Sequence, residues 1–317
     1  MRYPPQLSPE RFPLAHGVEG PLAGHFTPDG RRVAGASSGP LGWHSLSQFL
    51  ICQRKGWYYL TSGVPPRSVS EYMTVGTGVH AALAQQYEAV RCPQEELLSP
   101  ADAAIAAIHE DVGSDPFEQS AGWETTAARV LTITEQYLQA SKQEIIRFQT
   151  PHSGFEVLAV EAIYSKTYPA SRFASGITRT QRVDLVLRSP AGVVFADHKV
   201  TQKRVSAART VFSSDGQFDG YWELGQTHYG KDFAGTVLNT ISYDARTAHV
   251  KCTFDRYPVA FRADWKDIIR EALRRYRDAV KRQEQNREPP PGIAVYGTCH
   301  DWSNPCPFVQ LCRFGGA

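Results

Sequence analysis

The chain has 317 residues, of which 42% are hydrophobic and 21% are charged, and its formal net charge at pH 7 is +2. These proportions are ordinary for a globular protein, and the near-neutral charge excludes a chain that attracts polyanions through its overall charge, so any such site must be a local patch. The sequence has no apolar run of about 18 residues, and residues 1–17 lack the apolar segment of a signal peptide. We therefore expect a cytoplasmic protein with reduced cysteines and no membrane partner.

The first half of the chain is predominantly helical by its pattern. Residues 1–43 are rich in Pro and Gly, show no period and predict an irregular arm. Apolar residues then recur at helical spacing up to residue 150, and Ser45 is a candidate N-cap of the first helix. The predicted helices cover 44–60, 70–91, 101–111 and 121–148.

At about residue 155 the pattern changes to short β-branched, apolar segments. Three strands, a helix at 216–231, two further strands and an amphipathic helix at 263–285 are predicted in that order. The predicted strands cover 156–165, 181–189, 192–200, 235–243 and 248–254, with a turn at 189–192 between the second and third. This order predicts an α/β core over 155–288 that, with the helical part 44–150, forms one domain, followed by a cysteine-rich tail at 289–317.

Two acidic residues and a lysine lie on the second and third predicted strands. Asp197 and Lys199 alternate, so their side chains point to one face, and Asp184 lies beside them if the strands form a hairpin. Carboxylates that hold Mg²⁺ or Mn²⁺, next to a lysine that orients water or offsets charge on phosphorus, suit phosphodiester hydrolysis. The competing interpretation is an exposed hairpin with alternating charges. Acidic groups in so apolar a strand, however, are costly unless they are paired or metal-bound.

Further motifs stand in order around this group. Gly76-Thr77-Gly78-Val79-His80 precedes it, Glu161 lies on the first predicted strand, and Gln217-Phe218-Asp219-Gly220-Tyr221 follows it. With these motifs the sequence from about residue 44 onward resembles the PD-(D/E)XK nuclease superfamily, specifically its RecB-like branch. The resemblance implies a restriction-endonuclease-like core, a mixed central sheet flanked by helices, with a helical N-terminal half and a C-terminal cysteine-rich lobe.

The resemblance also implies a role for each matched residue. His80, Asp184 and Asp197 would bind the metal, and Lys199 would activate or orient water. Gln217 and Tyr221 would touch the lysine or the DNA backbone. Three alternatives without a catalytic role stay open. His80 can be a helix histidine whose polar atoms have partners within the protein, Tyr221 can be a structural residue, and Glu161 can cap or pair on the sheet surface.

The activity implied by the resemblance is Mg²⁺- or Mn²⁺-dependent cleavage of DNA. Exonuclease action on single strands or duplex ends is the commonest activity of the branch, in recombination, repair or phage DNA metabolism, with a possible recombination or helicase partner protein. The alternative is a catalytically silent DNA-binding or assembly subunit, which would have no physical need for the intact acid and lysine set.

Three cysteines crowd the tail as Cys299-x6-Cys306-x5-Cys312. Some RecB-like nucleases, among them CRISPR-associated and AddB-like ones, bind an iron–sulfur cluster with one early and three C-terminal cysteines. This resemblance implies a [4Fe–4S] cluster on Cys52, Cys299, Cys306 and Cys312, although the common first gap is the shorter Cys-x2-Cys. Four thiolates equally suit Zn²⁺, and unliganded thiols are a third alternative. Cys92 and Cys252 are expected to be ordinary buried residues.

The last predicted helix is strongly basic, and a solvated face is the usual explanation. A nuclease needs positive surface along its phosphate track, so this helix is a candidate DNA contact, as are Lys203 and Arg204. The basic residues concerned are Arg270, Arg274, Arg275, Arg277, Lys281, Arg282 and Arg287.

Overall fold

The computed structural model of the chain divides into two compact units, which are described separately below. The described residues are 42–61, 71–112, 121–150, 152–168, 177–244, 250–285 and 306. Unit 1 contains those within 69–164 and 183–261, and unit 2 contains those within 17–68, 165–182 and 262–317. Apart from residues 42, 43 and 306, the predicted arm and the predicted tail lie outside the described residues.

The helical first part forms as predicted, with one break. The helix predicted for 44–60 is two helices, α1 (Trp43–Ile51) and α2 (Gln53–Thr61), because Cys52 between them has an extended backbone with φ −157° and ψ 119°. Ser45 lies inside α1, whose N-cap is Gly42. Three longer helices follow at the predicted places: α3 (Glu71–Arg91), α4 (Pro100–Val112) and α5 (Ala121–Gln149).

A single mixed sheet has the strand order β1-β2-β3-β4-β5. The pairs β2–β3 and β4–β5 are antiparallel, whereas β3–β4 is parallel. The strands are β1 (Glu156–Tyr168), β2 (Ile177–Ser189), β3 (Gly192–Thr201), β4 (Phe233–Asp244) and β5 (Lys251–Val259).

The parallel pair requires a crossover connection, which the chain makes with helices. They are α6 (Val205–Ser213), α7 (Gly216–Tyr229) and the 3₁₀ turn η4 (Gly230–Asp232). Helix α6 was not predicted, because it is short, contains β-branched residues and buries only Ala208.

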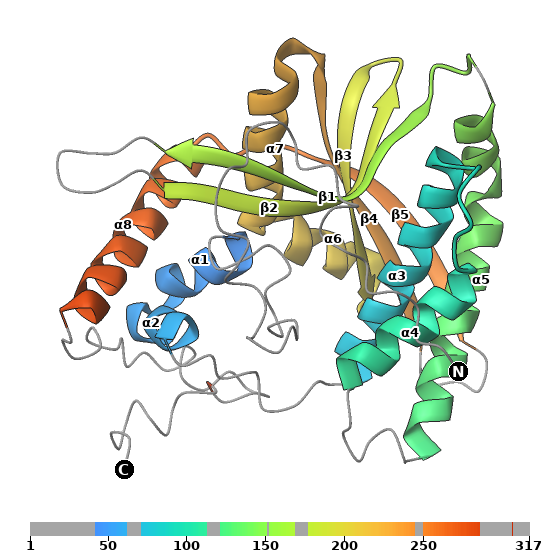
Figure 1. Cartoon of the computed structure of the whole chain (residues 1–317), viewed down its shortest axis with the longest axis horizontal. Helices are drawn as coiled ribbons and strands as arrows, with labels where there is room; N and C mark the ends of the chain where they lie inside the picture. The colour runs from blue at the N-terminus through green and yellow to red at the C-terminus, as the bar shows by residue number, and fades with distance from the viewer. Residues whose placement is uncertain are drawn as a thin grey trace. The chain divides into compact units, whose positions relative to one another are not determined.

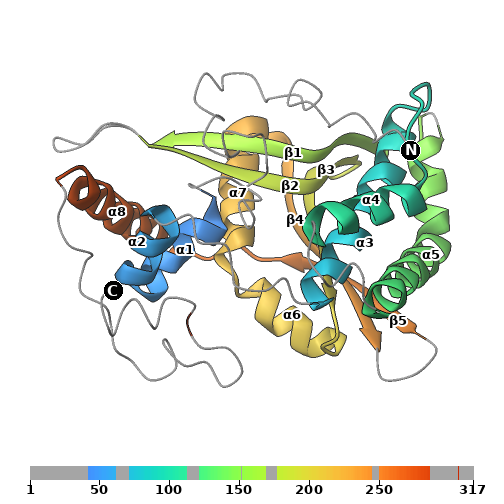
Figure 2. The same cartoon turned by 60° about the horizontal axis from the view of Figure 1, so that its bottom comes forward.

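Helices cover both faces of the sheet in unit 1 (Figures 1 and 2). One hydrophobic core joins α3, α4 and α5 to one face, and a second core joins α7 to the other. On β3, Ala196 and Val200 belong to the first core and Phe195 belongs to the second, as the alternation of a strand requires. We call these the α3 face and the α7 face.

Unit 2 consists of α1, α2, α8 (Trp265–Glu284) and the strand segments 165–168 and 177–182. Its core includes Trp43, Leu46, Trp265 and Ile269, and the rings of the two tryptophans lie 4.9 Å apart. The amphipathic helix predicted for residues 263–285 therefore buries its apolar face against α1.

The expected fold class is confirmed: a mixed sheet is flanked by helices and preceded by a helical N-terminal part. None of the helices in the described ranges combines the length and the apolar character needed to cross a membrane.

Candidate active site

The turn between β2 and β3 sets the register of the two strands that carry the predicted acids. Gly192 has φ 124°, and a Cβ at this position would collide with the backbone oxygen of Asp232, so only glycine fits. The ladder that follows pairs Leu185 with Ala196. Asp184 and Asp197 are the next residues of the two strands, so the two carboxylates leave this ladder at the same end.

Asp197 and Lys199 share the α7 face of β3. Lys199 Nζ lies 2.7 Å from Asp197 Oδ2 and donates a 2.9 Å hydrogen bond to Gln217 Oε1. Gln217 Nε2 and Tyr221 OH both donate to Asp197 Oδ1, at 2.6 Å and 2.8 Å. Helix α7 presents these two residues one turn apart and begins where the Asp215 side chain accepts from the Gln217 N–H. The predicted contact between the Gln-x-x-x-Tyr helix and the lysine is thus present.

A second group of ligand-type side chains comes from α3, β1 and β2. One ligand atom each of His80, Glu161 and Asp184 lies within 4.8 Å of the other two, and His80 Nδ1 is 3.3 Å from Asp184 Oδ2. Glu161 therefore accompanies two of the predicted metal ligands, whereas Asp197, the third, contacts Lys199. Two carboxylates and one imidazole are a donor set that fits Mg²⁺ or Mn²⁺.

Two glycines lie close to His80 on α3 and differ in their surroundings. A Cβ on Gly78 would lie 2.9 Å from side-chain atoms of Ile108 and Val130, so the missing side chain lets α3 pack closely on α4 and α5. A Cβ on Gly76, one turn before His80, would meet no atom within 4 Å. The space on this side of the helix next to His80 is open.

Glu161 has φ 51°, a left-handed conformation that is costly for any residue but glycine. The burial pattern of β1 changes phase at this residue: Val157 and Ala159 are buried before it, and Ala162 and Tyr164 after it. The irregularity thus interrupts the alternation of the strand where the carboxylate joins the metal-ligand group. Backbone strain of about 1–3 kcal/mol per residue is characteristic of functional sites.

Burial and charge together decide the protonation of the Asp197 and Lys199 pair. Burial raises the pKa of the Asp197 carboxyl, and the Lys199 charge works against that shift. Burial acts to lower the pKa of Lys199, but the carboxylates of Asp197 and Asp184 outweigh it and hold the pKa above its usual value. The raised pKa favours the protonated form of Lys199, in which the side chain is a hydrogen-bond donor.

His198, at the middle position of Asp-x-Lys, was missing from the predicted site. Its side chain is buried on the α3 face, where its ring stacks on Tyr87 and lies 6.1 Å from the ring of His80. Its Nδ1 is 2.6 Å from Asn239 Nδ2, and its backbone N–H donates to Asp184 Oδ2 at 2.8 Å. His198 thus touches one predicted ligand and packs against another. The only signal in the sequence was a polar residue on the supposed core side of an apolar strand.

We expect His198 to make the metal-free protein sensitive to acid. Burial, followed by the charge of His80, lowers the pKa of His198 to about 3, whereas an unfolded histidine titrates near ~6.5. Below about pH 6.5, His198 binds a proton in the unfolded chain but not in the folded chain. The free energy of unfolding therefore falls as pH falls below about 6.5. The expected loss from this group between pH 7 and pH 4 is on the order of 3 kcal/mol, at ~1.4 kcal/mol per pH unit.

Urea unfolding with a chelator present, repeated at several pH values, measures this effect. His198→Phe should give a flatter dependence of the unfolding free energy on pH over the same range. Parallel curves for wild type and variant would assign the acid sensitivity to other groups.

The other predicted residues belong to neither of these two groups of side chains or lie outside the described ranges. Cys52 is buried at the break between α1 and α2, and Cys306 is half-buried, as are Cys92 and Cys252. Cys299 and Cys312 lie outside the described residues. Lys203 and Arg204 are exposed between β3 and α6.

Comparisons with known proteins identify the family of the chain. The sequence model of the PD-(D/E)XK nuclease superfamily matches residues 41–313. Among solved structures, the crystal structure of SSO0001 is 12% identical, with 69% of this chain and 88% of that chain covered and a TM-score of 0.29. No curated protein matches the chain. Because the family match spans most of the chain and all of the described residues, the chain belongs to the PD-(D/E)XK nuclease superfamily.

Proposed function

We propose that the chain is a RecB-like deoxyribonuclease that uses Mg²⁺ or Mn²⁺ and degrades single-stranded DNA or duplex DNA from its ends. The observation that carries this proposal is that Asp184 links the candidate metal-ligand group to the Asp197 and Lys199 pair. Its carboxylate belongs to the ligand group with His80 and Glu161, and its charge acts on both Asp197 and Lys199.

His80, Glu161 and Asp184 would hold the ion, and Asp197 stands beside them as a further carboxylate. The bound ion would supply polarisation of the phosphate and a lower pKa for the attacking water. The two carboxylates of this group support the proposal, because their mutual repulsion in a partly buried setting would be relieved by a bound cation.

The protein's own contribution to the reaction lies in how Lys199 is held. An ammonium group has three N–H donors, and in the described part of the chain Asp197 and Gln217 take two of them. The third is available to a phosphate oxygen or to water, where the positive charge opposes the negative charge that develops on phosphorus. Tyr221 fixes the Asp197 carboxylate and thereby the lysine.

End-labelled single-stranded DNA, blunt duplex DNA and circular single-stranded DNA, each with Mg²⁺, Mn²⁺ or EDTA, test this function. We expect the linear substrates to be degraded with either metal, the circle to survive, and EDTA to stop the reaction. Cleavage of the circle would replace the exonuclease proposal by an endonuclease. No cleavage of any substrate would favour the alternative of a silent DNA-binding or assembly subunit that acts with a recombination or helicase partner.

We also propose that Cys52, Cys299, Cys306 and Cys312 bind a [4Fe–4S] cluster, with Zn²⁺ as the alternative. Cys52 supports this by its position, since it is buried and breaks the helical run between α1 and α2. Cys306 belongs to the same unit. The role would be structural, because metal-assisted hydrolysis does not need such a cluster.

Anaerobically purified protein should be brown and contain about four irons per chain if this proposal is right. Cys306→Ser should lose the colour, whereas Cys252→Ser, the same change in unit 1, should keep it. Colourless protein that carries one zinc would establish the alternative, and colourless protein without metal would refute both.

A further inference from the structure

Helix α8 is rich in basic residues, and only some of them are paired with acidic residues. Three of its arginines are engaged. Arg270 pairs with Asp267, Arg274 pairs with Glu271 and Asp278, and Arg275 pairs with Glu271 and donates to the backbone oxygens of Phe49 and Leu50. The side chains of Lys281 and Arg282 in the last turns have no ion pair or hydrogen bond within the described part of the chain.

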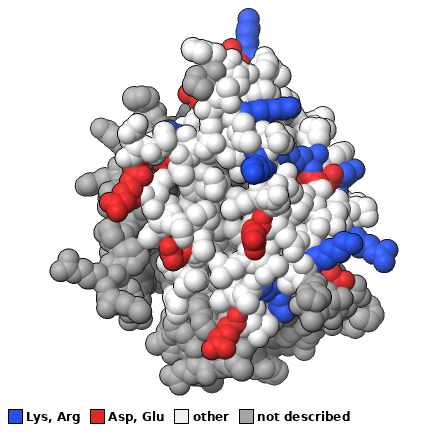
Figure 3. Space-filling model, turned by 90° about the vertical axis from the view of Figure 1, so that its right-hand side faces the viewer, with Lys and Arg blue, Asp and Glu red and all other residues white. Residues whose placement is uncertain are grey.

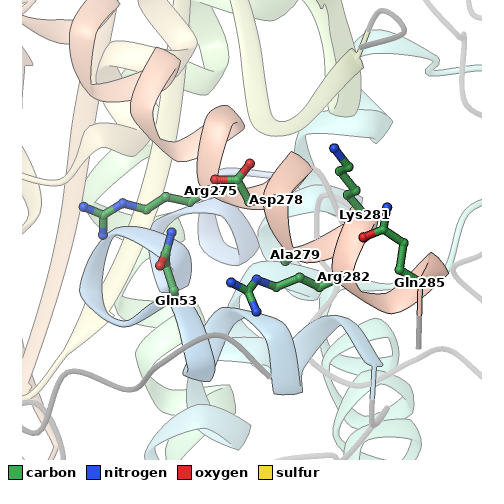
Figure 4. A pocket seen from close by; sticks show the side chains of 7 residues that line it. All are labelled: Gln53, Arg275, Asp278, Ala279, Lys281, Arg282 and Gln285. Atoms are coloured by element: carbon green, nitrogen blue, oxygen red, sulfur yellow. The ribbon is translucent and has the colours of Figure 1, made fainter. Parts of the chain in front are cut away.

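These two residues line a hollow between α2 and α8 with a volume of about 230 Å³. Figure 4 shows Arg282 of α8 and Gln53 of α2 on its two sides, with Ala279 between the helices and Gln285 at one end. The hollow exists because the buried side of α8, which starts with large residues such as Trp265 and Ile269, ends in the single methyl group of Ala279.

The lining chemistry selects an anion. Arg275 and Asp278 also line the hollow, but each already has an oppositely charged partner on α8, so Lys281 and Arg282 contribute the charge that remains. A guanidinium fork, an ammonium and the amides of two glutamines are donors that match the oxygens of a phosphate. The volume lies below the ~300–1,000 Å³ of small-molecule sites, so the occupant is one group of a larger molecule.

The surface around α5 differs from the end of α8 in how its charges are distributed. On the face that carries α5, positive and negative side chains are interspersed among the described residues (Figure 3). A mixed surface of this kind has no preference for a polyanion, whereas the end of α8 has one.

We propose that the hollow between α2 and α8 binds phosphate groups of the DNA backbone, so that unit 2 holds the substrate through contacts that do not depend on base sequence. This inference rests on the proposed nuclease function for the identity of the polyanion. The competing explanation is that the two cations only stabilise the C-terminal end of α8 by interaction with its dipole.

A pair of double variants separates the two explanations. Lys281→Gln/Arg282→Gln removes the cations of the hollow. Lys266→Gln/Arg270→Gln removes two charges from the first turns of the same helix, and neither residue lines the hollow. DNA affinity is measured by fluorescence anisotropy over a range of salt concentrations, with a single-stranded oligonucleotide and full-length protein as purified. Mg²⁺ and Mn²⁺ are left out to prevent cleavage, and melting temperatures are recorded in parallel.

We expect the variant of the hollow to bind about tenfold more weakly at low salt, with its salt slope reduced by about 1.4, which is ~0.7 for each of two phosphates on a single strand. The control variant should keep the wild-type slope. Equal effects of the two variants, or a lower melting temperature of the first without a change in slope, would overturn the proposal. Displacement of the DNA by poly-glutamate at lower charge concentration than by unlabelled DNA would also overturn it, in favour of an acidic protein partner.

The same data distinguish this inference from the proposed function. Wild-type protein that degrades DNA with Mn²⁺ while the variant of the hollow binds like wild type refutes the inference alone. Wild-type protein that cleaves nothing refutes the function, and the salt slopes still decide whether the hollow binds phosphates.

Discussion

Asp184→Asn should reduce DNA cleavage at saturating Mg²⁺ or Mn²⁺ by at least about 10³-fold, because bound metal supplies several kcal/mol to the transition state and ~1.4 kcal/mol is a factor of ten. The asparagine oxygen can still accept the His198 N–H, so the β2–β3 ladder should survive. What the substitution removes is one negative charge from the group that includes His80 and Glu161.

Single-turnover cleavage and direct Mn²⁺ titration measure the two consequences of this change. Asp255→Asn is the matched control, since it makes the same chemical change at a carboxylate that pairs with Arg209 away from the metal-ligand group. The control should cut within about twofold of wild type, as expected for a partly exposed ion pair. An Asp184→Asn variant that binds Mn²⁺ and cuts as well as the control would remove Asp184 from the site.

Lys199→Met should have a second kind of large effect, because it abolishes cleavage and also destabilises the metal-free protein. Removal of one partner from a buried ion pair costs ~3–5 kcal/mol, and we expect about 3 kcal/mol here because the Lys199 side chain is 22% exposed. The variant leaves Asp197 buried without its counter-charge, so the pKa of that carboxyl rises further. The folded variant then binds a proton that the unfolded chain has released, and its stability falls as pH rises above about 4.

The double variant Asp197→Asn/Lys199→Met separates catalysis from stability. It removes both charges of the buried pair, so it should recover most of the lost unfolding free energy. Its stability should also depend less on pH than that of Lys199→Met, and it should stay inactive. Chemical unfolding at several pH values, with cleavage assays on the same samples, supplies both readouts. A single variant that is as stable as wild type and independent of pH would contradict the buried-charge argument, and one that still cuts would contradict the role of Lys199.

Local patterns were sufficient to predict which side chains lie together on β3 and α7 in the candidate site. Asp197 and Lys199 share a face because a strand alternates, and Gln217 and Tyr221 share one because four residues make about one helical turn. Both rules depend only on neighbouring residues. The contact between Gln217 and Lys199 then follows from the crossover helix that packs against the same face of the sheet.

Features that depend on tertiary packing were harder to predict. Glu161 was placed on a strand, but its positive φ arises where β1 changes its alternation, and no residue type announces that change. His198 looked like a spacer between two functional residues. It is buried because Asn239 of β4 and two helices of the α3 face provide partners for it, and those partners come from distant parts of the sequence.

The parallel pairing of β3 with β4 has a consequence for the synthesis of the protein. The ribosome releases His80 early and the acid-bearing hairpin later, but β3 has only one neighbouring strand until the crossover and β4 have followed. Non-local pairing of this kind forms late in folding, since the chain must close a long loop first. A nascent or truncated chain that lacks β4 therefore carries the acidic residues without the complete sheet that arranges them.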